Sequence, residues 1–133
     1  MKTAATTEGL ADIEAELLAM GSAAQALTKA MVAAGGEVLR GAMETAARAH
    51  VRTGAMAAST AVSKIKADKS GASAEVTFEG TDARGVRNAE KAFYLNYGTS
   101  RIKADRFVDN AASQAAETVD AAMRAAFDTM KTT

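Results

Sequence analysis

The strongest constraint on the fold is a long amphipathic segment near the C-terminus. Its apolar residues recur at spacings of three and four, the periodicity of one face of an α-helix; they are Val108, Ala111, Ala112, Ala115, Val119, Ala122, Met123, Ala126 and Met130. We predict a helix with Asp105 as its N-cap that ends near Met130. A helix of this length with one apolar face must be covered by other elements.

The N-terminal part shows related patterns. Residues 1–7 are small and polar, which predicts a flexible tail. Residues 8–52 should form a helical part with two helices. The first ends at Gly21, a residue that suits a helix C-cap, and its apolar positions are Leu10, Ile13, Leu17 and Met20. The second is expected to begin at the capping box of Ser22 and Gln25.

The second helix should be the central one, because it carries two adjacent apolar stripes. It is expected to end near Arg52, where Thr53 and Gly54 form a structural turn. Each glycine inside a helix costs about 1 kcal/mol relative to alanine. Three such glycines therefore indicate a kink or the close approach of another backbone: Gly35, Gly36 and Gly41.

The middle of the chain predicts a β-hairpin. Two short stretches, Val62–Ala67 and Ala74–Glu79, flank a turn-rich linker, and a helical turn over residues 55–59 precedes them. The second stretch alternates apolar and polar residues, as in a strand with one buried face. The first is less regular, because Val62 and Ile65 would point to opposite faces. The polar loop Gly80–Arg87 is expected to be mobile.

A short helix should follow, with Asn88 as its cap and Ala89–Tyr97 as its body. Gly98 occupies a C-cap position, and with Thr99 it forms a second structural turn. Phe93, Tyr97 and Phe107 are expected in the core. Residues 1–133 thus predict a single α+β domain: N-terminal helices, a hairpin or small antiparallel sheet, a short helix, and a long C-terminal helix packed on the sheet.

Composition narrows the function classes. Alanine makes up about a quarter of the chain, and it brings little apolar area to bury. This suits a subunit that completes its burial against neighbours. Sixteen basic and sixteen acidic residues give zero net charge, which permits self-association. There is no cysteine, hence no disulfide or thiolate chemistry, and no window approaches a membrane span.

No arrangement of residues indicates catalysis. His50 is the only histidine and cannot form a multi-histidine metal site. Asp105 and Asp109 lie one helical turn apart, but their position at a helix start explains both as stabilising that end. We therefore expect no enzyme, no cofactor and no metal.

Basic residues between Arg84 and Arg106 leave one alternative open, a small nucleic-acid-binding module that uses this cluster on a phosphate backbone. Acidic residues are interspersed among them, which favours a mixed-charge protein interface.

The order of motifs resembles a known family. The motifs are Thr53-Gly54-Ala55-Met56, a hairpin, Ala92-Phe93-Tyr94-Leu95-Asn96-Tyr97-Gly98-Thr99-Ser100, and Ala104-Asp105-Arg106-Phe107. From about Arg48 to the end, the chain resembles the neck and tail-completion proteins of long-tailed bacteriophages. It departs from that pattern at Asn96, where the family usually has Glu, and at Arg106, where it usually has Pro. Ala92-Phe93 also replaces the usual Tyr-Ala.

The resemblance implies a structural virion protein that forms a ring, commonly sixfold, at the head–tail junction or tail end. It completes the tail and allows head–tail joining. The implied partners are other copies of the chain and the tail-tube or head-connector proteins. DNA would pass through the ring without sequence-specific binding, and no membrane is involved. The implied location is the tail or neck of the virion, after assembly in the host cytoplasm. Expected interface residues are Arg84, Arg87, Tyr94, Asn96, Ser100, Arg101 and Lys103.

Overall fold

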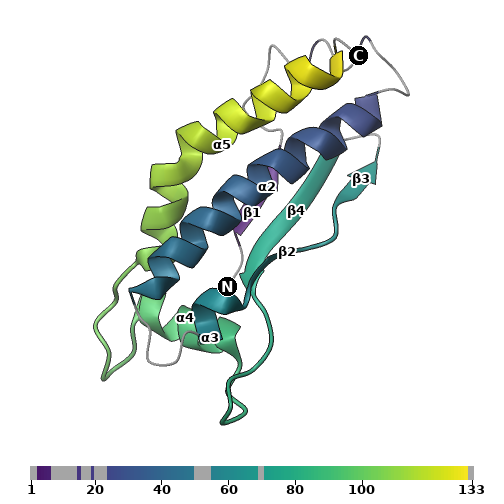
Figure 1. Ribbon diagram of the computed structural model, residues 1–133. Coiled ribbons are helices and arrows are strands. Elements are labelled where there is room, and N and C mark those ends of the chain that lie inside the picture. Colours follow the sequence, from purple (N-terminus) through teal and green to yellow (C-terminus); the bar gives the residue numbers. More distant parts are fainter. Residues whose placement is uncertain are drawn as a thin grey trace.

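The computed structural model describes residues 3–6, 15, 19, 24–49, 55–68 and 71–131 (Figure 1). It confirms the predicted α+β class. In chain order the elements are β1 (Thr3–Thr6), α2 (Ala24–Arg48), α3 (Ala55–Ala58), β2 (Thr60–Val62), β3 (Lys66–Asp68), β4 (Gly71–Phe78), α4 (Asn88–Tyr97) and α5 (Phe107–Lys131). Three sequence predictions lie outside the described residues: the capping box at Ser22, the role of His50 and the Thr53–Gly54 turn. Of the helix predicted over Leu10–Met20, the structure describes only Ala15 and Ala19, and both are helical.

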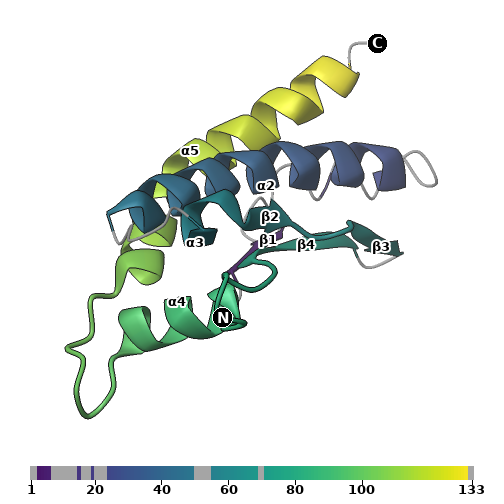
Figure 2. The same cartoon turned by 60° about the horizontal axis from the view of Figure 1, so that its bottom comes forward.

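Two long helices and one small sheet form three layers. Helix α2 lies between the sheet and α5, and α5 runs along α2 over most of its length (Figure 2). Side chains of the neighbouring layers, and not another backbone, approach the glycines of α2: a Cβ at Gly35 would lie 2.9 Å from Cγ of Met123 on α5, whereas one at Gly41 would meet no atom within 4 Å. A Cβ at Gly36 would lie 3.2 Å from Val62 on the sheet side. Glycine therefore lets α2 approach both neighbouring layers.

The sheet is antiparallel, and β4 is its central strand. Strand β1 pairs with one edge of β4, from Thr3 opposite Val76 to Thr6 opposite Ser73. Strands β2 and β3 also pair with β4. Thr3–Thr6 are therefore part of the sheet, where the sequence predicted a flexible tail.

A bulge separates β2 from β3. Val62 pairs with Val76 and Lys66 pairs with Ser73, so three residues of one strand lie opposite two of β4. Ser63 fills the interruption: its N–H donates to the Glu75 carbonyl at 2.7 Å, and its Oγ accepts from the Glu75 N–H at 2.8 Å. The extra residue reverses the side-chain alternation, so Val62 and Ile65 both pack against the core.

The core has two adjoining clusters between the sheet and the helices. The buried residues of the first are Leu27, Met31, Val32, Ala72, Ala74, Met123 and Phe127. Those of the second are Leu39, Met43, Ala47, Met56, Ala57, Val76, Phe78, Ala92, Phe107 and Val108. Helix α5 packs mainly on α2 and reaches the sheet with long side chains, as where the rings of Phe107 and Phe78 lie 6.2 Å apart.

Candidate protein-interaction surface on α4

Helix α4 buries small and polar side chains and exposes large ones. The three residues of its inner face are spaced four apart and are all buried: Asn88, Ala92 and Asn96. Its large aromatic residues point the other way, with 46% of Phe93, 42% of Tyr94 and 46% of Tyr97 exposed. The sequence predicted Phe93 and Tyr97 in the core, and the structure corrects both positions. Phe107 is buried as predicted.

Hydrogen bonds at both ends hold α4 to the domain, together with apolar contacts of Ala92 and Leu95 in the second core cluster. At the start of α4, Nδ2 of Asn88 donates to the Glu79 carbonyl at 2.9 Å, and the Asn88 N–H donates to the Gly80 carbonyl at 3.0 Å. At its end, the carbonyls of Leu95 and Asn96 accept from the N–H groups of Asp105 and Arg106.

Asn96 joins α4 to α5. Its Oδ1 accepts hydrogen bonds from the N–H groups of Val108 at 3.0 Å and Asp109 at 3.3 Å, both in the first turn of α5. An acceptor at this place satisfies helix N–H groups that have no partner within the helix. The sequence assigned this role to Asp105, but α5 begins at Phe107 and Asn96 provides the acceptor. Asn96 is completely buried, which corrects its predicted place at a partner interface.

The exposed rings of Phe93, Tyr94 and Tyr97 form one continuous surface, which we call the aromatic face. The ring centroid of Phe93 lies 4.9 Å from that of Tyr97 and 6.1 Å from that of Tyr94. The guanidinium of Arg106 lies 5.3 Å from the Tyr97 ring centroid, within range of a cation–π interaction. The Tyr94 hydroxyl donates to Glu90 at 2.9 Å, and this carboxylate raises the pKa of Tyr94.

Charged loops flank the aromatic face at both ends of α4. Arg84 and Arg87 precede the helix, whereas Ser100, Arg101 and Lys103 follow it, and all five are exposed. Figure 1 shows the two loops at the same end of the molecule. The structure therefore places the predicted interface residues other than Asn96 on and around one helix: Tyr94 lies on α4, and the other five lie in two groups at its ends.

The loop before α4 is a hydrogen-bonded turn, where the sequence predicted a mobile loop. Oδ1 of Asp82 accepts from the N–H groups of Arg84 at 2.8 Å and Val86 at 3.0 Å, and its Oδ2 lies 3.1 Å from Nζ of Lys91. The Val86 N–H, followed by Lys91, lowers the pKa of the Asp82 carboxyl. Asp82 thereby links this turn to α4.

The loop after α4 turns at Gly98 and Thr99. Gly98 has a φ of 81° and its N–H donates to the Tyr94 carbonyl at 2.8 Å. The hydroxyl of Thr99 accepts from the N–H groups of Arg101 and Ile102, both at 3.1 Å. Arg106 has a φ of 59°, which proline cannot adopt, so the observed backbone excludes proline at this position.

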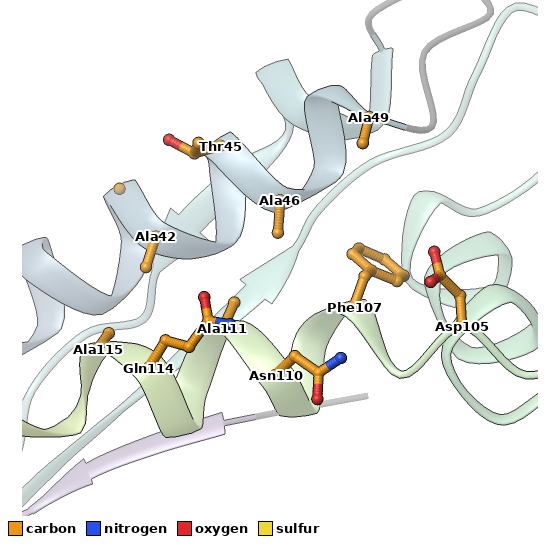
Figure 3. A pocket seen from close by; sticks show the side chains of 11 residues that line it. Ala42, Thr45, Ala46, Ala49, Asp105, Phe107, Asn110, Ala111, Gln114 and Ala115 are labelled. Carbon is orange, nitrogen blue, oxygen red and sulfur yellow. The ribbon is translucent and has the colours of Figure 1, made fainter.

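An open groove lies between the second half of α2 and the start of α5 (Figure 3). Its volume is about 580 Å³. Small residues form most of its walls, and Figure 3 shows Ala42 and Ala46 of α2 facing Ala111 and Ala115 of α5. The remaining lining residues are Gly41, Thr45, Ala49, Asp105, Phe107, Asn110 and Gln114.

The described part of the chain offers few groups for chemistry. It contains no cluster of three or more histidine, cysteine or acidic residues that could hold a metal ion. The carboxylate of Asp109, one helical turn from Asp105, lies 3.0 Å from the guanidinium of Arg106. Among the described helices, none is long and apolar enough to cross a membrane.

Comparison with models of known protein families, with curated protein sequences and with solved structures gives no match for this chain.

Proposed function

We propose that this chain is a structural assembly subunit of a tailed bacteriophage or a phage-derived particle. It forms a ring at the head–tail junction or tail end, completes the tail and allows head–tail joining. The order of the sequence motifs before, within and after α4 supports the assignment of the chain to a tailed bacteriophage. The single observation that carries the assembly role is the aromatic face, where three large rings are exposed side by side on a helix with a small, polar inner face.

Physical chemistry favours a partner for this face. A large aromatic side chain can bury about 150–250 Å², and burial of apolar surface gains about 25 cal/mol per Å². A helix that served only its own domain would turn such residues inward, as α5 does with Phe107 and Phe127. Contiguous exposed apolar surface marks interaction sites, and aromatic residues with arginine are enriched at the centres of protein interfaces.

The charge arrangement favours a protein partner over a nucleic acid. Lys91 pairs with Asp82 at 3.1 Å and Arg106 pairs with Asp109 at 3.0 Å. The remaining basic residues divide between the two ends of α4, whose ten residues span about 15 Å at 1.5 Å per residue. Paired and divided charges suit a mixed protein interface better than a continuous phosphate-binding stripe.

Size-exclusion chromatography with light scattering tests the proposal, on the chain alone and mixed with purified tail-tube protein. Wild type should form a closed oligomer or bind the tube. The double variant Phe93→Ser, Tyr97→Ser should remain folded by circular dichroism but lose this association. Met130→Ser is the control, because Met130 is similarly exposed, at 43%, near the end of α5 remote from α4. A wild-type chain that stays monomeric in both samples would contradict the proposal.

A further inference from the structure

We infer that the aromatic face of one copy binds in the groove between α2 and α5 of a second copy. This inference rests on the proposed function and deepens it, because it names the surface that receives α4. The contact would join two different surfaces of the same chain. Such head-to-tail contacts form a ring when the rotation between neighbouring copies closes.

The two surfaces differ in the size of their side chains. The half-exposed rings of Phe93 and Tyr97 lie side by side, with ring centroids 4.9 Å apart. In the groove, glycine and alanine leave space between the helices, and a Cβ placed on Gly41 would meet no atom within 4 Å. Large side chains on one surface and small ones on the other allow close packing.

Polar groups are also placed to complement each other. The groove carries the exposed side chains of Thr45, Asn110 and Gln114 among its apolar walls. A tyrosine has an apolar ring and a hydroxyl that seeks a hydrogen-bond partner when buried. Tyr97 could therefore place its ring against alanine and its hydroxyl against one of these polar side chains.

Charge distinguishes this arrangement from a symmetric pairing of two aromatic faces. Residues 81–104, which carry the aromatic face, contain five basic and two acidic residues. Among the described residues that line the groove, the charged one is Asp105, which is acidic. Two α4 faces would bring like charges together, whereas α4 against the groove brings opposite net charges together.

Cysteine cross-linking tests this geometry, since the chain has no native cysteine. Tyr94→Cys leaves Phe93 and Tyr97 in place, and Thr45→Cys labels the groove. After mild oxidation, the mixture of the two variants should give a cross-linked dimer that neither variant gives alone. Replacing Thr45→Cys with Ala125→Cys, at an exposed position on α5, should abolish that dimer. A dimer formed mainly by Tyr94→Cys alone would overturn the inference.

Filling the groove provides a second test with a separate readout. Gly41→Leu adds a side chain where the fold has space, and leucine favours a helix over glycine, so the variant should fold. Its self-association should weaken at least tenfold in sedimentation equilibrium, whereas Ala125→Leu should associate like wild type. If Gly41→Leu assembles normally while Phe93→Ser, Tyr97→Ser does not, the groove is not the receiving surface and the proposed ring stands. If wild type does not assemble at all, both proposals fail.

Discussion

At the residue scale, Asn96 shows how one buried side chain connects two elements. Its Oδ1 accepts from two N–H groups of α5, although its own backbone belongs to the last turn of α4. This amide group, together with the backbone hydrogen bonds from Asp105 and Arg106 to the carbonyls of Leu95 and Asn96, positions α4 relative to the start of α5. The Nδ2 of Asn96 is buried with no hydrogen-bond partner, so part of the gain is offset by the cost of burying a donor.

Replacing Asn96 should destabilise the domain. We expect Asn96→Ala to lower the free energy of unfolding by about 1–3 kcal/mol, because it leaves buried N–H groups without an acceptor. Asn96→Asp should lose less at pH 7, since a carboxylate also accepts from N–H groups and is favoured at a helix N-terminus. Urea unfolding followed by circular dichroism measures both variants. Equal losses for the two would show that Oδ1 does not act as a cap.

At Gly98 both a positive φ and a close contact oppose a larger residue, whereas at Gly85 only the positive φ does so. The φ of Gly98 is 81°, and an added Cβ would lie 2.8 Å from both the Ala104 N and the Ile102 O. Gly85 has nearly the same φ, 82°, but an added Cβ there would meet nothing within 4 Å. Gly85→Ala should therefore cost about 1–2 kcal/mol from backbone conformation alone, and Gly98→Ala should cost more because it adds a steric clash. Denaturant titration of both variants measures the difference, and equal costs would refute the close contact at Gly98.

At the element scale, the attachment of α4 to the domain depends on the polar turn before the helix as well as on the helix itself. Asp82 connects that turn to Lys91 on α4 and accepts from two backbone N–H groups. These contacts require the ionised carboxylate, which is why the pKa of Asp82 is lowered on folding. The attachment of α4 should therefore weaken in acid.

The direction of this pH effect follows from the lowered pKa. In the unfolded chain Asp82 should titrate near its ordinary pKa of about 3.9. Its contribution to stability is fully present above that pH and is lost as the pH falls through the lower pKa of the folded state. The melting temperatures of wild type and Asp82→Asn should thus differ at pH 6 and converge toward pH 2. Glu117→Gln, on the exposed side of α5, serves as the control, and a constant Asp82 difference across this range would contradict the assignment.

At the scale of the whole molecule, the six aromatic residues divide equally between the buried core and the exposed surface. Phe78, Phe107 and Phe127 are buried between the sheet and the long helices, whereas the aromatic face is exposed at one end. Half of the aromatic side chains are therefore buried in the domain's own core. The exposed half remains for contacts with other molecules.

This division predicts opposite phenotypes for two phenylalanine variants. Phe107→Ala should lower the free energy of unfolding by about 3–5 kcal/mol, because it opens a cavity in the core. Phe93→Ala should change stability by only about 0.5 kcal/mol, as is usual for surface positions, yet weaken self-association. Thermal unfolding and sedimentation on the same samples measure both effects. A large loss of stability in Phe93→Ala would place that ring in the core after all.

The sequence alone determined the elements whose signals are local. The spacing of apolar residues located α2 and α5, because both helices turn one face toward the interior along their whole length. Alternation located β4, whose residues from Ala72 to Phe78 are buried at every second position. Gly98 marked the end of α4, where the backbone has a positive φ.

Only the tertiary structure decided the features that depend on distant partners. Strand β1 exists through pairing with β4, and the bulge near Ser63 exists because Val62 and Ile65 must both reach the core. Periodicity shows which residues share a face, but not which neighbour covers it. The ends of α4 bond to the Glu79 carbonyl and to the first turn of α5, and these contacts turn its asparagines inward and its aromatic rings outward. The sequence pointed to the segments around α4, but it placed Phe93 and Tyr97 in the core, and only the packing of the whole domain showed that they are exposed.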